Sequence, residues 1–212
     1  GLRTEVRATS TSRLAKTHYS RSLPHIHPPG ETLFVTFRLA GSLPMEKLLE
    51  LRAEQVRAET AATTPKEVIR AHKRHFARWD TALHAADFGP TWLRQVEVAA
   101  AVAAELHQLS ETKHQLWCFC LMPNHVHVVV GLPEDGQVFY KAMQQLKGRT
   151  AYRCNQLLSR TGSFWQPESY HHVIRNGQEM QNVVSYVLEN PVKAGLVDDW
   201  QQWPHTYLNP EY

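Results

Sequence analysis

The hydrophobic positions alternate in some stretches of the chain and recur at helical spacing in others, which predicts a mixture of strands and helices. Alternation predicts strands at residues 31–40, 114–120, 125–131 and 169–176. Helical spacing predicts two helices between about residues 44 and 87, and single helices at about 91–109, 136–159 and 179–189. The second and third strands are joined by the short segment "LMPN", which favours an antiparallel pair.

The same pattern predicts how the chain is organised. Residues 1–30 are rich in Ser, Thr, Arg, His and Pro without a sustained period, so we expect an irregular basic arm. Residues 31–212 are predicted to form one domain, since a chain of 212 residues is short for two. The helical stretch at about 44–88 reads as an insertion. Its apolar stripes need a partner, so it is expected to pack against the core or against a second subunit.

Composition narrows the class of protein. Hydrophobic residues make up 42% and charged residues 20% of the chain, which is typical of a globular protein. No apolar run reaches the roughly 18 residues that a membrane helix needs, and no basic segment followed by an apolar one opens the chain. The three cysteines form an odd set without a disulfide framework. These features predict a cytoplasmic protein that does not enter a membrane.

Positive charge is unevenly spread along the chain. The formal net charge is only +3, yet residues 111–160 alone carry six basic and three acidic side chains. A phosphate-rich partner such as DNA would be attracted to such a segment, although a basic stretch is more often a solvated surface. The candidate DNA-backbone contacts lie on the helix at 136–159 and in the arm: Lys141, Lys147, Arg149, Arg153, Arg13, Lys16 and Arg21.

The stretch "LMPNHVHVVV" carries the first candidate chemistry. His125 and His127 are two residues apart, so in a strand both imidazoles project from one face. The β-branched valines that follow favour a stiff strand, which would hold the two rings as a pre-aligned pair of metal ligands. Taken singly, either histidine is more often a hydrogen-bonded polar group at a sheet surface.

The stretch "SYVLENP" contains a second set of candidate functional residues. Tyr186 and Asn190 are four residues apart and therefore share one face of a helix. A tyrosine hydroxyl is a nucleophile, and an amide oxygen is a neutral ligand that would join two imidazoles around a divalent cation. Alone, Tyr186 reads as a core aromatic residue and Asn190 as a helix C-cap before a proline.

Four segments together resemble a known family. "LMPNHVHVVV", "QQLKGRTAYRCNQ", "FWQPESYHHVIRN" and "SYVLENPVKAGLV" occur in the order and at the approximate spacing of the single-tyrosine HUH transposases, most closely the REP-associated tyrosine transposases. The resemblance implies an α+β fold with a ferredoxin-like antiparallel sheet. It also implies that His125, His127 and Asn190 bind Mg²⁺ or Mn²⁺ and that Tyr186 is the nucleophile.

The activity implied by this resemblance is nicking and rejoining of single-stranded or hairpin DNA, of REP type, through a 5′-phosphotyrosine link. The protein would act as a monomer or a homodimer. Two alternatives stay open on the residues alone. Cys118 and Cys120 alternate on a neighbouring strand and offer a Cys₂His₂ zinc set with the histidines. The second alternative is a DNA-binding protein that has kept the fold and lost the catalytic activity.

Overall fold

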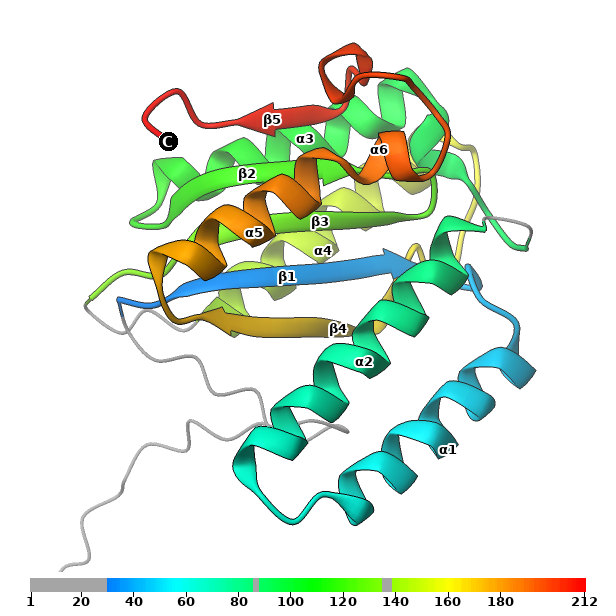
Figure 1. Ribbon diagram of the computed structural model, residues 1–212. Coiled ribbons are helices and arrows are strands. Elements are labelled where there is room, and N and C mark those ends of the chain that lie inside the picture. Colours follow the sequence, from blue (N-terminus) through cyan, green and yellow to red (C-terminus); the bar gives the residue numbers. More distant parts are fainter. Residues whose placement is uncertain (1–29, 86–87, 135–138) are drawn as a thin grey trace, which may run out of the picture.

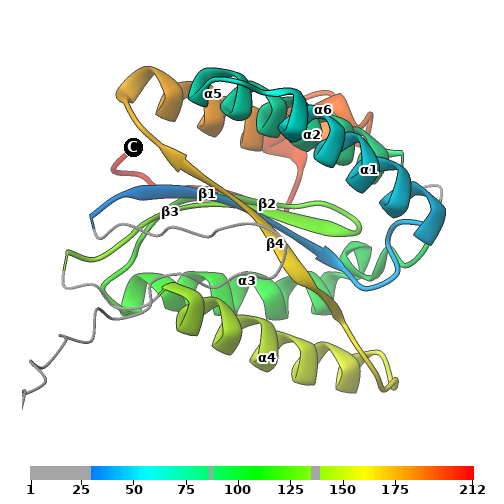
Figure 2. The same cartoon turned by 90° about the horizontal axis from the view of Figure 1, so that it is seen from below.

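In the computed structural model, residues 30–85, 88–134 and 139–212 are described, and they form an antiparallel sheet with helices on both faces (Figures 1 and 2). The strands are β1 (Thr32–Leu39), β2 (Gln115–Leu121), β3 (His125–Gly131), β4 (Trp165–Ile174) and β5 (Thr206–Leu208). The α-helices are α1 (Met45–Ala61), α2 (Pro65–His84), α3 (Val96–Glu111), α4 (Phe139–Leu157), α5 (Gly177–Leu188) and α6 (Asn190–Lys193). Two short 3₁₀ helices are η1 (Trp92–Arg94) and η2 (Trp200–Gln202).

The sheet has the strand order β4-β1-β3-β2-β5. Its first four strands, with α3 after β1 and α4 after β3, follow the chain order and the strand order of a ferredoxin-like βαββαβ unit. The fold is therefore α+β, as predicted. The strand pairs are antiparallel, and β3, which carries the two histidines, lies in the middle of the sheet between β1 and β2.

Alternation along β3 separates the two faces of the sheet. Val126, Val128 and Val130 belong to the core under α3 and α4, whereas Val129 belongs to a second core under α5. His125 and His127 share the parity of Val129, so their side chains project into the α5 side of the sheet. Figure 2 shows this division, with α3 and α4 on one side and α1, α2, α5 and α6 on the other.

The insertion forms a helical hairpin, α1 and α2, on the face that carries the histidines (Figures 1 and 2). Its second helix begins with a capping box, in which Thr64 and Glu67 satisfy each other's backbone amides. Phe76 of α2 stacks on Tyr170 of β4, with ring centroids 4.1 Å apart. The expectation that the insertion packs against the core is thus confirmed for the second helix.

The predicted strands and helices are confirmed with small shifts at their ends. Three-residue β5 was not predicted, because a segment of that length carries too little alternation to stand out. The helix expected to run to residue 189 ends at Leu188, and Asn190 opens α6 instead of capping α5. None of the helices in the described part of the chain is long and apolar enough to span a bilayer.

Candidate metal and nucleophile site

His125 and His127 lie fully buried on β3 with their rings held by neighbouring side chains. His127 Nδ1 is 2.7 Å from Thr36 Oγ1 on β1, and His125 Nδ1 is 2.7 Å from Asn124 Oδ1. The two Nε2 atoms are 3.0 Å apart and face the same space. The sequence argument that both rings point one way is therefore confirmed.

Asn124 fixes which nitrogen of His125 carries the proton. Its Nδ2 donates to the main-chain oxygen of Leu83 at 3.0 Å, so its Oδ1 must be the atom that faces His125. Because an amide oxygen only accepts, His125 Nδ1 donates the hydrogen bond and Nε2 keeps its lone pair. An imidazole oriented in this way by a second residue is typical of metal-binding histidines.

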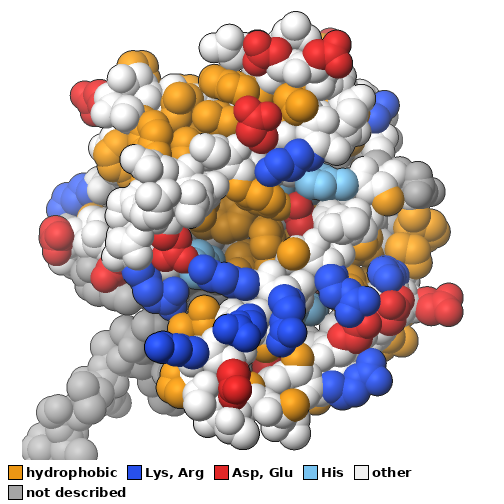
Figure 3. All heavy atoms as spheres, in the orientation of Figure 1, with side chains coloured by type: hydrophobic (Ala, Val, Ile, Leu, Met, Phe, Trp, Pro, Cys, Tyr) orange, Lys and Arg blue, Asp and Glu red, His pale blue; other side chains and the backbone are white. Residues whose placement is uncertain are grey.

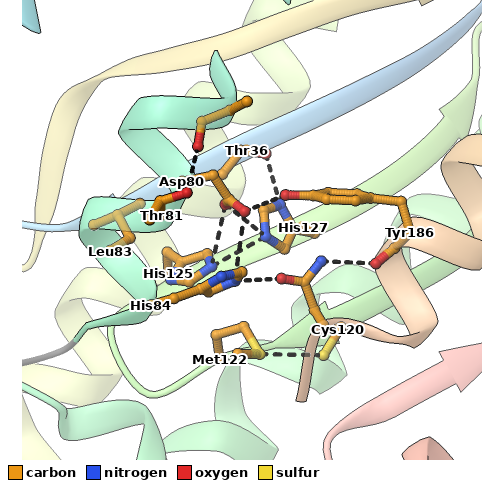
Figure 4. Close-up of polar contacts among 12 residues, drawn as sticks. Thr36, Asp80, Thr81, Leu83, His84, Cys120, Met122, His125, His127 and Tyr186 are labelled. Atoms are coloured by element: carbon orange, nitrogen blue, oxygen red, sulfur yellow. Dashed lines mark hydrogen bonds and ion pairs between the residues drawn. The ribbon is translucent and has the colours of Figure 1, made fainter. Parts of the chain in front are cut away.

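Two further side chains enter this space from α2, as Figure 4 shows. Asp80 and His84 are one helical turn apart, and with the histidines of β3 they form a group whose ligand atoms all lie within 4.8 Å of one another. Asp80 Oδ1 is 3.2 Å from His127 Nε2 and 3.8 Å from His125 Nε2. The group that could hold a metal ion thus includes two residues of the insertion that the sequence reasoning did not select.

Tyr186 and Asn190 reach the same place from α5 and α6. The Tyr186 hydroxyl donates a hydrogen bond to Asp80 Oδ2, and its ring centroid is 5.6 Å from that of His127. Asn190 is fully buried, and its Nδ2 donates to the main-chain oxygen of Tyr186 at 2.8 Å. Its Oδ1 contacts His84 Nε2. The predicted nucleophile and the predicted ligands are therefore brought together, although Asn190 faces His84.

The charges of the site suit a cation. Burial lowers the pKa of His125 well below the usual value, which keeps that ring neutral as a ligand must be. Burial also opposes ionisation of Asp80, but the interactions with His127 outweigh it and hold the pKa of the Asp80 carboxyl below its usual range. Burial and the adjacent Asp80 carboxylate raise the pKa of Tyr186. A neutral phenol, an anionic carboxylate and a neutral imidazole therefore meet at one point.

One atom of this cluster lacks the partner that burial demands. Asp80 Oδ1 is buried and makes no well-aligned hydrogen bond with any described residue, although it lies within ion-pair distance of His127. An unsatisfied buried carboxylate oxygen is costly. A divalent cation among Asp80, His125 and His127 would satisfy it, so the donors present fit a metal ion.

Comparison with known proteins bears on the same residues. Residues 94–190 match the sequence model of the family described as "Transposase IS200 like". This stretch, a little under half of the chain, is therefore similar to that family. It contains His125, His127, Tyr186 and Asn190, the four residues for which the resemblance implies a role in catalysis. It begins after α2, so Asp80 and His84 come from outside the matched range.

Two curated relatives are similar to this chain over part of its length. A Haemophilus influenzae protein assigned to the REP-associated tyrosine transposases is 27% identical over 96 residues, covering 41% of this chain and 54% of that protein. The Escherichia coli REP-associated tyrosine transposase is 31% identical over 84 residues, covering 40% of this chain and 48% of that protein. The matches thus span about half the length of these relatives.

A solved structure shares the fold. The structure of a REP-associated tyrosine transposase bound to a REP hairpin aligns with a TM-score of 0.55 at 18% sequence identity. The alignment covers 88% of this chain and 82% of that one. The α+β architecture is therefore shared between the two structures.

The candidate DNA contacts do not gather at this site. Lys141, Arg149 and Arg153 are exposed on α4, on the opposite face of the sheet from the histidines (Figure 2). Lys147 is instead turned inward, where its Nζ donates to the main-chain oxygens of Gln166 and Pro167. Burial lowers the pKa of Lys147 to about 8. Arg13, Lys16 and Arg21 lie outside the described residues.

A different basic residue lies beside the nucleophile. Lys193 of α6 places its Nζ 4.7 Å from the centroid of the Tyr186 ring, and its side chain is exposed. Between α5 and α2 the surface is hollowed, with an apolar floor and Lys and Arg side chains along its border (Figure 3).

The zinc alternative finds no support among the described residues. Cys120 lies opposite His127 in the β2–β3 register, yet neither it nor Cys118 belongs to the group of metal-ligating side chains. Cys120 donates a weak hydrogen bond to Met122 Sδ at 3.7 Å. Burial raises the pKa of Cys120 to about 12 and that of Cys118 further still, so both are neutral thiols packed in the core.

Proposed function

We propose that the protein is a metal-dependent endonuclease and strand transferase that acts on single-stranded or hairpin DNA, as a transposase does. Its nucleophile is Tyr186, and His125 and His127 hold Mg²⁺ or Mn²⁺. The observation that carries the proposal is the convergence of three elements at one point. The Tyr186 hydroxyl from α5 and the two Nε2 atoms from β3 meet at the carboxylate that α2 supplies.

The residues divide the chemistry between them. The metal, when bound, polarises a non-bridging oxygen of the scissile phosphate and offsets its negative charge. His125 and His127 present their Nε2 atoms to it, while Asn124 and Thr36 hold the rings in place. Lys193 is placed to neutralise a second phosphate oxygen beside the nucleophile. A ligand role for Asn190 stays a prediction. The Oδ1 atom of Asn190 contacts His84 Nε2, so His84 must turn away before that oxygen can face the ion.

The proposed reaction conserves the phosphodiester bond energy. Tyr186 Oη loses its proton and attacks phosphorus, forming a 5′-phosphotyrosine link. The bond from phosphorus to the 3′-oxygen breaks, and that oxygen gains a proton to leave as a 3′-hydroxyl. A later 3′-hydroxyl attacks the phosphotyrosine, which restores the phenol and rejoins DNA without ATP.

The DNA substrate is proposed from the family. One structural relative is bound to a REP hairpin, and the fold is shared with it. We therefore propose a hairpin with a short single-stranded flank as the substrate, and either a monomer or a homodimer as the working unit. The exposed basic side chains of α4 would then follow the DNA backbone away from the reacting phosphate.

The decisive experiment looks for the covalent link. Labelled hairpins from the flanks of the protein's own gene are incubated with the full chain and Mn²⁺, and the products are separated under denaturing conditions. We expect a nick and a denaturant-stable adduct that maps to the peptide "SYVLENPVK". Tyr186→Phe should abolish both while DNA binding survives.

Two other tyrosines serve as controls. Tyr152→Phe makes the same change on the exposed face of α4 and should leave nicking intact. Tyr170→Phe tests the ring that packs against Phe76, and it should also retain the adduct. An adduct on Tyr170 or Tyr152 would overturn the assignment of the nucleophile. Hairpin binding by the wild-type chain without any adduct would instead identify a DNA-binding protein that has lost its chemistry.

A further inference from the structure

Asp80 lies at the centre of the site, yet it belongs to neither of the motifs that mark the site in the sequence. Asp80 is only 4% exposed, and both of its carboxylate oxygens point inward. Oδ2 accepts the hydrogen bond of the Tyr186 hydroxyl, and Oδ1 faces the two histidines of β3. One carboxylate therefore bridges the nucleophile and the metal-binding pair.

The spacing of the three inward-facing atoms fits a common cation. His125 Nε2 and His127 Nε2 are 3.0 Å apart, and Asp80 Oδ1 is 3.2 Å and 3.8 Å from them. Ligands at about 2.0–2.2 Å from one ion lie roughly 3.0–3.5 Å apart in octahedral or tetrahedral geometry. Only small movements of Asp80 are therefore needed to bring all three atoms to bonding distance.

A purely structural role for Asp80 leaves an atom unexplained. The hydrogen bond from Tyr186 uses Oδ2 alone, and Oδ1 stays buried without a well-aligned partner among the described residues. His84, the fourth member of the group, is engaged elsewhere, because its Nε2 contacts Asn190 Oδ1. Asp80 is thus the residue of α2 with a free ligand atom aimed at the histidines.

We propose that Asp80 is the third protein ligand of the metal and the positioning residue for Tyr186, with Oδ1 on the ion and Oδ2 on the phenol. The inference rests on the function proposed above. It assigns a chemical role to the inserted hairpin, which presents Asp80 from outside the matched range. Three protein ligands leave coordination positions for phosphate oxygens and water.

The first test measures metal binding without DNA. Mn²⁺ is titrated calorimetrically into the full chain and into Asp80→Asn, which keeps the side-chain volume and removes the charge. We expect at least a tenfold loss of Mn²⁺ affinity. Glu54→Gln is the matched control, since it makes the same change on the same hairpin and breaks the ion pair with Arg78, 2.9 Å away. It should bind Mn²⁺ within twofold of the wild type.

The second test measures positioning. At saturating Mn²⁺, single-turnover nicking by Asp80→Asn should be slower at every hairpin concentration, while the concentration that gives half-maximal rate is unchanged. Asp80→Glu retains the carboxylate at a different reach and should recover Mn²⁺ affinity above that of Asp80→Asn. The Asp80→Glu variant also tests the proposal if Asp80→Asn does not fold. In that case a Mn²⁺ affinity of Asp80→Glu no higher than that of Asp80→Ala would contradict the proposal.

The outcomes separate this inference from the proposed function. If Asp80→Asn binds Mn²⁺ as tightly as the wild type while His125→Ala and His127→Ala lose it, Asp80 is not a ligand and the nuclease proposal stands. If the wild-type chain forms no adduct on Tyr186, the function itself fails, whatever Asp80 does to Mn²⁺ binding.

Discussion

Asn124 is the residue whose replacement tests most directly how the fold prepares the site. It is 1% exposed and joins two elements, since Nδ2 donates to Leu83 O on α2 and Oδ1 accepts from His125 Nδ1. Asn124→Ala removes both hydrogen bonds at once. The His125 ring is then free to turn or to move its proton to Nε2, the atom that must bind the metal.

The size of the effect follows from the two groups left without a partner. A buried polar group that loses its hydrogen bond costs about 1–3 kcal/mol, so with two such groups Asn124→Ala should lower the free energy of unfolding by about 2–6 kcal/mol. That loss is within the roughly 5–15 kcal/mol typical of a folded domain. Loss of the residue that orients a ligating histidine typically weakens metal binding by about 10–100-fold, or about 1.4–2.7 kcal/mol.

The assay combines urea denaturation with Mn²⁺ calorimetry on the same samples. Asn209→Ala is the matched control, because Asn209 Nδ2 also donates to a main-chain oxygen, that of Leu116, at 2.9 Å. It should reduce stability and leave Mn²⁺ affinity unchanged. If Asn124→Ala binds Mn²⁺ within twofold of the wild type, Asn124 does not orient His125 for the metal and the reasoning is refuted.

Three further predictions concern the core, the nucleophile's surroundings and the DNA path. Phe37 is fully buried in the core under α3 and α4, with its ring centroid 4.8 Å from that of Trp165, so Phe37→Ala should cost about 3–5 kcal/mol of stability by urea denaturation; a loss below 1 kcal/mol would contradict this packing. Lys193→Gln should slow single-turnover nicking by roughly 10–100-fold, the worth of one charged hydrogen bond, without changing stability; an unchanged rate means that Lys193 does not hold the phosphate. Replacing both Lys141 and Arg153 with Gln should reduce the slope of log hairpin affinity against log salt concentration by about two. The nicking rate at saturating DNA should not change. An unaltered slope would mean that the DNA does not contact these two residues.

The sequence carries most of the fold because its elements are long and regularly patterned. The alternation of Val126, Val128 and Val130 with His125 and His127 predicts one apolar face and one functional face of β3, and the structure has both. The i, i+4 spacing of Tyr186 and Asn190 likewise survives the break between α5 and α6. Such features depend only on local geometry, which spacing encodes directly.

The contribution of α2 to the site was not predictable in the same way. Asp80 lies on the apolar stripe of its helix, since Phe76 precedes it by four residues and Leu83 follows by three. An acidic residue on such a stripe signals a buried partner, and His84 one turn later strengthens the signal. That pattern does not identify the partner, because the direction in which an inserted hairpin folds back depends on tertiary contacts far away in sequence.

Those contacts are concentrated on the loop that precedes the histidine strand. Where the chain leaves β1, Leu39 N–H donates to Asn124 O at 2.8 Å, and where it returns in η1, Leu93 N–H donates to Pro123 O at 3.2 Å. The end of α2 is held by the bond from Asn124 to Leu83. The insertion therefore leaves and rejoins the sheet at one point, which preserves the ferredoxin-like strand order around it. That point adjoins His125, and the last two turns of α2, which contain Asp80, lie against the histidine pair.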